Sequence, residues 1–201
     1  MADIRSQFEI SNDQGNPIPS EITDGTNIAE ITPEGLVKIQ NRVSPVGTAA
    51  FEGTLFSSFA SNLIDDIEVP FALMRNPTNG TKTATIYYII TASITKGRTA
   101  DFMFYASPTV TDVGTQLATV NRKRVGTPPT SEMLLYEMPT TSDNGNHFSS
   151  ISVGVNSNSI IHNLNGSLII GPDHDVLLTA VSSGSKTELD VSVIWAERPL
   201  S

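Results

Sequence analysis

From about residue 60 onward, short stretches of alternating apolar and polar residues are separated by turns. In the segment 64–73, apolar side chains occupy every second position from Ile67 to Leu73, which is the period of a β-strand. Pro70 has no N–H to donate, so it would place this strand at a sheet edge or at a bulge. We therefore expect a strand here with an irregularity at Pro70.

Residues 83–95 form the clearest predicted strand, because Thr, Ile and Tyr dominate them. Their continuous apolar run, residues 86–90, predicts burial on both faces, as in a central strand. The turn at residues 96–98 leads into residues 101–106, so these two strands are predicted to pair as a hairpin.

More strands are expected in the second half of the chain. The dipeptide Asn165-Gly166 is the strongest two-residue hairpin signal in the sequence, and it predicts a turn between residues 160–164 and 167–170. In the last strand, alternation predicts that Leu189, Val191, Val193 and Trp195 share one face. The predicted strands here are 116–124, 132–137, 147–155, 159–162, 167–170, 176–181 and 188–195.

Helical periodicity is weak throughout the sequence. Residues 54–63 are ambiguous, because Leu55, Phe56, Phe59 and Leu63 would fit two or three helical turns. Short strands at regular spacing with turns between them are typical of sandwiches, jelly rolls and barrels. The fold class predicted is all-β: a β-sandwich or jelly-roll domain over residues 51–201.

Residues 1–50 are polar and interrupted by turns. Strand-like pieces at 21–23, 28–31 and 36–39 are too short to make a core alone. We interpret residues 1–50 as an extended acidic N-terminal arm that folds against a neighbouring molecule. A loose tail, or a strand pair packed on its own domain, remains an alternative.

Composition narrows the function classes. The 201 residues suffice for one β-sandwich with an extension, and the absence of cysteine excludes disulfides, thiolate metal sites and cysteine nucleophiles. The net charge is −9, and residues 1–70 hold 11 acidic and 3 basic residues. This distribution argues against nucleic-acid binding, which needs a basic face, and suits docking onto a basic protein surface.

Membrane insertion is not expected. The first ten residues lack the apolar stretch of a signal peptide, and the longest apolar runs, 86–90 and 102–106, are far shorter than a membrane span. We expect a soluble protein made in the cytoplasm of the producing cell.

Two acidic clusters are candidates for reactive sites. Asp173-His174-Asp175 could hold a cation, but it follows Gly171-Pro172 and is better interpreted as a turn, since consecutive strand residues point to opposite faces. Asp65-Asp66-Glu68 could supply paired carboxylates, but a solvated strand edge is the simpler interpretation. We predict no metal site, no cofactor and no enzymatic activity; no serine lies in a G-x-S-x-G elbow.

Arg122-Lys123-Arg124 is the one basic cluster in the sequence. A nucleic-acid patch fits poorly with an acidic chain, and a solvated strand end is the simplest interpretation. Our hypothesis is that Arg122, Lys123 and Arg124 make an inter-subunit contact by receiving acidic residues of the arm, including an arm from a neighbouring subunit.

Short motifs along most of the chain resemble small virion proteins of tailed bacteriophages. They are Gly15-Asn16-Pro17-Ile18-Pro19, Asp24-Gly25-Thr26-Asn27, Gly35-Leu36-Val37-Lys38, Ala118-Thr119-Val120-Asn121-Arg122-Lys123-Arg124, Leu134-Leu135-Tyr136-Glu137 and the ending at residues 166–197. The resemblance carries no catalytic residues.

What the resemblance implies is a β-sandwich or jelly-roll subunit of a phage particle, of the capsid decoration (cement) type. Such a protein is expected in the virion, as a homo-oligomer, commonly a trimer, on the major capsid protein. The alternatives are a tail, fibre-base or receptor-binding virion protein that recognises a host surface, and, less favoured, a glycan hydrolase.

Overall fold

The structure is a computed structural model that describes residues 22–23, 27–31, 37–41, 45–123, 126–127, 129–154 and 159–200. The chain divides into two compact units, residues 1–47 and 48–201. The first contains the antiparallel sheet β1-β2-β3, built from β1 (Ile22–Thr23), β2 (Asn27–Ile31) and β3 (Val37–Asn41). Strands thus occur in the three predicted pieces, while most of the predicted arm lies outside the described residues.

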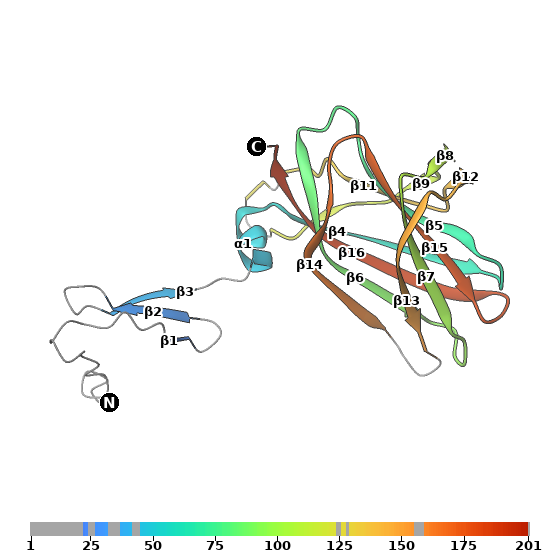
Figure 1. Ribbon diagram of the computed structural model, residues 1–201, viewed down its shortest axis with the longest axis horizontal. Helices are drawn as coiled ribbons and strands as arrows, with labels where there is room; N and C mark the ends of the chain where they lie inside the picture. Colours follow the sequence, from blue (N-terminus) through green and yellow to red (C-terminus); the bar gives the residue numbers. More distant parts are fainter. Residues whose placement is uncertain are drawn as a thin grey trace. The chain divides into compact units, whose positions relative to one another are not determined.

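The second unit is built on eight long strands. They are β4 (Leu55–Ile64), β5 (Val69–Asn76), β6 (Lys82–Ser93), β7 (Ala100–Ala106), β13 (Asn146–Val153), β14 (Ile160–Ile170), β15 (His174–Ser182) and β16 (Thr187–Pro199). One sheet contains them in the order β4-β16-β6-β14 and the other in the order β13-β7-β15-β5. The two sheets pack on each other in Figure 1.

The pairing of these strands is that of a jelly roll. The first four pair with the last four in reverse, β4 with β16, β5 with β15, β6 with β14 and β7 with β13, all antiparallel. The chain is therefore wound as one long hairpin whose paired strands are divided between two sheets. The predicted all-β sandwich of the jelly-roll type is confirmed.

Residues 107–145 form an insertion between β7 and β13. It contains β8 (Thr109–Asp112), β9 (Thr115–Gln116), β10 (Val120–Asn121), β11 (Leu134–Glu137) and β12 (Thr140–Asp143). In it, β10 pairs with the outer edge of β4, β11 pairs with the outer edge of β5, and β9 extends β11. The insertion thereby covers one edge of each sheet, and the long strand predicted at 116–124 is instead two short pieces.

Both predicted hairpins are wrong. Strands β6 and β7 lie in different sheets, so the turn at residues 96–98 crosses the sandwich. Asn165 and Gly166 lie inside the continuous strand β14, with φ of 49° and 77°. They lie at a register shift against β6, so the positive-φ pair that favours a tight hairpin forms a bulge here.

A second bulge explains the apolar run in β6, which is central as predicted. The pairing with β16 shifts between Tyr88 and Ile86, which leaves Tyr87 as the extra residue. Ile86 and Ile89 are both buried in the core, because the extra residue reverses the alternation between them. Tyr87 is also buried, at 7% exposed.

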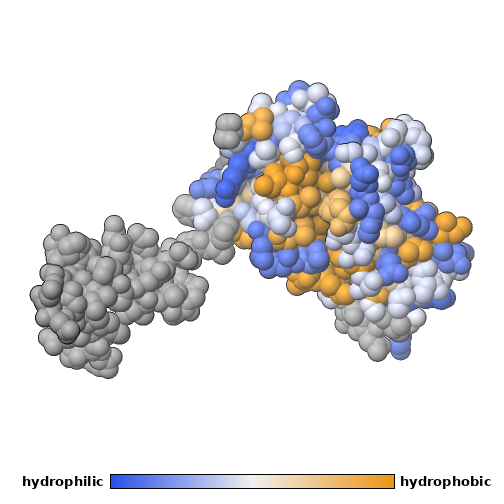
Figure 2. Space-filling model, viewed as in Figure 1, coloured by the Kyte–Doolittle hydropathy of each residue, from blue (hydrophilic) through white to orange (hydrophobic). Residues whose placement is uncertain are grey.

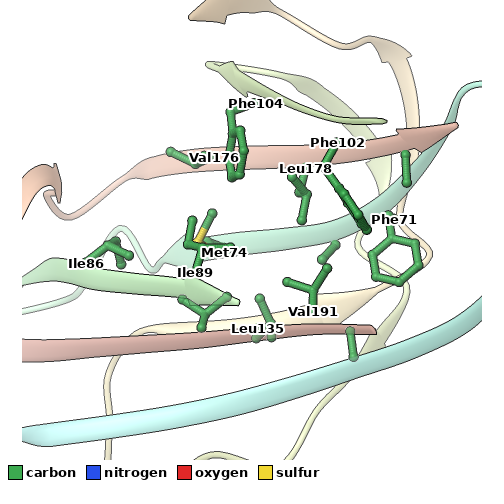
Figure 3. Packing of buried hydrophobic residues seen from close by; sticks show 14 of the residues in the cluster. Phe71, Met74, Ile86, Ile89, Phe102, Phe104, Leu135, Val176, Leu178 and Val191 are labelled. Atoms are coloured by element: carbon green, nitrogen blue, oxygen red, sulfur yellow. The ribbon is translucent and has the colours of Figure 1, made fainter. Parts of the chain in front are cut away.

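The core lies between the two sheets (Figure 3). Leu189, Val191, Val193 and Trp195 of β16 are 0–1% exposed, which confirms the predicted face. Within the six-stranded sheet, Phe71 of β5 and Phe102 of β7 meet edge to face, with ring centroids 5.9 Å apart. These two residues and the four of β16, which belong to the five-stranded sheet, are members of one buried apolar cluster, so the inward faces of both sheets supply the core.

The segment 54–63 is a strand and not a helix. In β4 the buried positions include Phe56, Ser58 and Ala60, which alternate with period 2. Phe59 and Leu63, which suggested helical turns, point outward and are 51% and 64% exposed. Because small residues such as Ser58 and Ala60 point inward and the large residues Phe59 and Leu63 point outward, the sequence of β4 does not show the usual alternation of a strand.

The helix α1 (Pro45–Glu52) was not predicted. It begins at Pro45, a residue type favoured in the first turn, and it ends at Glu52, just before Gly53, whose φ is +81°. The N–H of Gly53 bonds to Ala50 O (3.3 Å) and that of Thr54 to Ala49 O (2.9 Å), the hydrogen-bond pattern of a Schellman cap. A helix of eight residues is too short to show a clear period of 3.6 residues in the sequence.

The irregularity predicted at Pro70 is present. In the pairing of β5 with β15, Ala72 faces Leu178 and Pro70 faces Thr179, so Phe71 is the bulged residue. The backbone carbonyl of Phe71 accepts a hydrogen bond from Met138 N at 2.9 Å. The predicted strand 64–73 is interrupted, however, because residues 65–68 are a loop between the sheets.

Candidate functional site

The predicted turn is formed by Pro172 and Asp173, and His174 and Asp175 begin β15; each of the three side chains from Asp173 to Asp175 has its own partner. Asp173, with φ of 62°, accepts a hydrogen bond from Thr78 Oγ1 at 2.7 Å. His174 Nδ1 lies 2.7 Å from Pro172 O. Arg75 Nε donates to both carboxylate oxygens of Asp175, at 2.9 Å from Oδ1 and 3.1 Å from Oδ2. Hydrogen bonding to Asp175 is the main reason that the pKa of Arg75 is raised.

An open hollow of about 560 Å³ lies beside this turn. Its lining is polar and is made by Arg75, Asn76, Pro77, Thr78, Asn79, Asp173 and Asp175. Because Arg75 and Asp175 neutralise each other across two paired strands, the hollow presents amide and hydroxyl groups together with the carboxylate of Asp173. Such a surface can hydrogen-bond a neutral polar ligand.

The acidic run Asp65-Asp66-Glu68 lies in the loop between β4 and β5, and not on a strand edge as expected. Asp65 Oδ1 accepts a hydrogen bond from Lys186 N at 3.0 Å. Glu68 Oε1 accepts hydrogen bonds from Thr179 Oγ1 at 2.7 Å and Tyr105 Oη at 3.0 Å. Burial and this contact with Glu68 raise the pKa of Tyr105. The run fastens the loop to the six-stranded sheet.

The basic cluster follows β10 at the covered edge of the five-stranded sheet. The exposed Arg122 donates its backbone N–H to Leu55 O at 2.9 Å, and Lys123 donates its own to Asn121 Oδ1 at 2.8 Å. Neither side chain forms an ion pair with another described residue. Arg124 lies outside the described residues, so the predicted contact with acidic arm residues stays a prediction.

Glu197 is a buried carboxylate that sequence reasoning missed. It is 2% exposed, near the end of β16. Its oxygens accept hydrogen bonds from Ser131 Oγ, Glu132 N (2.9 Å), Met133 N (3.0 Å), Trp195 Nε1 (3.3 Å) and Lys82 Nζ (3.4 Å). One acid therefore joins β16, β6 and the insertion by accepting hydrogen bonds from all three.

Glu132 makes a second junction beside Glu197. It accepts hydrogen bonds from Thr81 N (2.6 Å), Thr81 Oγ1 (2.8 Å) and Lys82 N (3.0 Å), and Lys82 Nζ lies 3.5 Å away. Burial opposes its ionisation, but these hydrogen bonds and the charge of Lys82 outweigh burial. The pKa of Glu132 is consequently below its ordinary value of 4.5.

This lowered pKa gives a pH prediction. Ionised Glu132 stabilises the folded state fully above pH 4.5, and the contribution is lost as the pH falls through its folded-state pKa. We expect Glu132→Gln to cost about 1 kcal/mol of unfolding free energy at pH 7 and progressively less in acid. Urea unfolding from pH 7 to 3 measures this, with Glu188→Gln, which alters an exposed carboxylate, as the control. An equal cost for Glu132→Gln at every pH would contradict the prediction.

Strands β13 and β14 form the side of the sandwich that the insertion leaves open; we call them the open side. Among the described residues, neither has a strand partner on its outer edge. No Asp, Glu, Lys or Arg occurs between Asp143 and Asp173, although residues 48–201 contain 23 of them. Figure 2 shows hydrophobic surface gathered on the face of the larger unit where these strands lie in Figure 1.

A narrow apolar groove lies between the two strands of the open side. Phe148 comes from β13, His162, Leu164 and Leu168 from β14, and Phe104 from β7. The rings of Phe104 and Phe148 are 6.2 Å apart, and Phe148 is 47% exposed. On β14, Ile161 and Ile169 are 63% and 60% exposed. A charge count along the sequence would have drawn attention to this region.

Within the described part of the chain, no three His, Cys, Asp or Glu side chains converge on a position that could hold a metal ion. No helix there has the length and apolar character needed to cross a membrane.

Comparison with known proteins adds no family to these observations. No protein-family model matches the chain, and no curated protein matches it.

Proposed function

We propose that this protein is a non-enzymatic structural subunit of a virus particle, of the capsid decoration type suggested by the phage-like motifs. It acts as a homo-oligomer, a trimer in the form we favour, bound to the major capsid protein. The observation that carries the proposal is the jelly roll with one covered side and one uncharged, apolar open side. Jelly rolls build many viral coat domains, although the fold alone does not decide function.

The proposed mechanism is mechanical. An oligomer that bridges several capsid subunits gains avidity from simultaneous weak contacts and resists their separation. The small N-terminal unit, residues 1–47, supplies an additional contact at each subunit. Exposed Arg122 lies at the covered edge, where it and Lys123 are available to acidic arm residues from a neighbour.

Light scattering on the full chain and on a variant lacking residues 1–44, which keeps α1 complete, tests this proposal. We expect a stable oligomer, with a trimer at three times 21.5 kDa, that loses mass or stability when the arm is removed. A double variant with Arg122→Glu and Arg124→Glu is also expected to lose mass by light scattering. A full chain that stays monomeric would contradict self-assembly, and an unchanged mass for the Glu variants would remove the basic cluster from the interface.

A second candidate is a tail, fibre-base or receptor-binding protein that recognises a host surface. The polar hollow beside the β15 turn favours it, because its amide, hydroxyl and carboxylate groups can form hydrogen bonds with the hydroxyls of a sugar. Binding of the full chain to bacterial surface polysaccharide, reduced by Asn79→Trp and not by Lys96→Trp, would support it. Both substitutions alter exposed residues, and only Asn79 lines the hollow.

A further inference from the structure

We propose that a second copy of this chain docks along the open side, with strand edges and apolar side chains of β13 and β14 forming the contact. This inference rests on the self-assembly proposed above and adds to the arm and the basic cluster a further contact surface that self-assembly requires.

Unpaired backbone groups provide the first argument. An edge strand exposes N–H and C=O groups that can pair with another strand, and proteins blunt such edges with charges, prolines or bulges. The insertion covers the edges of β4 and β5. The 11-residue β14 contains no charged residue and no proline. Of the features that hinder pairing with another strand, it has only the bulge at Asn165-Gly166.

Exposed apolar side chains provide the second argument. Ile161 of β14 lies in a row across the outer face of the sheet, next to Ile90 of β6. Beyond Ser192 of β16, the same row reaches Phe59 of β4, which is 51% exposed. The row leads to the open edge, so a strand added there would extend the sheet and cover Ile161.

The distribution of charge indicates which partner binds the open side. The protein has a net charge of −9, so two copies repel each other over most possible approaches. The 29 residues from 144 to 172 carry no Asp, Glu, Lys or Arg, so copies that meet there bring no like charges together. A basic partner would instead be expected to select an acidic surface, which the open side is not. A second copy fits this surface because its own edge offers the complementary donors and acceptors.

Light scattering of the full chain with Ile161→Lys tests the inference, and Ile67→Lys is the matched control. Both replace an exposed isoleucine with lysine, at 63% and 70% exposure, but Ile67 lies in the loop between β4 and β5. We expect the oligomer to persist with Ile67→Lys and the mass to fall to 21.5 kDa with Ile161→Lys. Circular dichroism checks that both variants are folded.

The outcomes separate the two proposals. If the wild type is an oligomer and Ile161→Lys leaves its mass unchanged, the open side is not the interface, while self-assembly stands. If the wild type is a monomer, self-assembly itself fails.

Disulfide trapping gives an independent readout, because the chain has no cysteine. Cysteine is placed at one of the exposed β14 positions, Ile161, Asn163, Asn165, Ser167 or Ile169, alone or together with Ser150→Cys on β13. A bond forms only where Cα atoms approach within about 4.4–6.8 Å. Linked copies from a single cysteine indicate β14 against β14, and linkage that needs both indicates β14 against β13 of the next copy. No linkage at any position overturns the inference.

Discussion

Replacing Glu197 by Ala is expected to lower the free energy of unfolding by about 3–5 kcal/mol. The carboxylate is 2% exposed, and its removal would leave the N–H groups of Met133 and Trp195 without an acceptor in the interior. Lys82 would lose its buried partner. Since the same acid joins β16, β6 and the insertion, the loss would affect the whole unit. Chemical denaturation at pH 7 measures it.

Two further substitutions test the cause. Glu188→Ala removes an exposed acid from the same strand, and we expect a change within about 0.5 kcal/mol. Glu197→Gln keeps an acceptor oxygen but turns an amide NH₂ toward existing donors, so an intermediate loss is expected. If Glu197→Ala cost no more than Glu188→Ala, the hydrogen-bond network would have no importance for stability.

Replacing Phe102 by Ala is expected to destabilise the sandwich by about 3–5 kcal/mol. Phe102 is 0% exposed in β7 and meets Phe71 of β5 edge to face. Figure 3 shows it among side chains from both sheets. The substitution removes apolar contacts and leaves a cavity that close-packed β-strands cannot collapse to fill. Thermal and denaturant unfolding measure the loss.

Phe59→Ala is the matched control. Phe59 is also a phenylalanine on a long strand, but it is 51% exposed on the outer face of β4. We expect it to cost less than about 1 kcal/mol. Comparable losses for Phe59→Ala and Phe102→Ala would show that the described core is not where stability resides.

Alternation along the chain predicted much of the sandwich, because half-buried strands impose a period of 2 on their side chains. The final strand shows this well: Leu189, Val191, Val193 and Trp195 all face the core. Alternation contains no information about which strands are neighbours. The turn at residues 96–98 has the composition of a hairpin turn, yet it joins strands of opposite sheets. Pairing is decided by the burial of two sheet faces against each other.

Local irregularity explains the other differences. Asn165-Gly166 supplies two residues with positive φ, and both a tight turn and a bulge can use them. Glu197 could not be identified in advance, since all its donors except Trp195 come from residues 82 and 131–133, which are distant in sequence. The turn at Asp173 was predicted because Gly-Pro-Asp has a local conformational preference that needs no distant partner.

The winding of the jelly roll also determines when the protein can fold. Strands β15 and β16 are the last two of the larger unit in chain order, yet β15 lies between β7 and β5, and β16 lies between β4 and β6. During synthesis on the ribosome, therefore, neither sheet can close until its central strand has emerged. Leu55, for example, can pair with Ala196 only after almost the whole of the larger unit has been synthesised. Pairing between residues so distant in sequence makes folding slow, on the order of milliseconds to seconds. In that interval the nascent β4 to β7 have exposed edges, so chaperone protection at this stage of translation would raise the yield of folded protein.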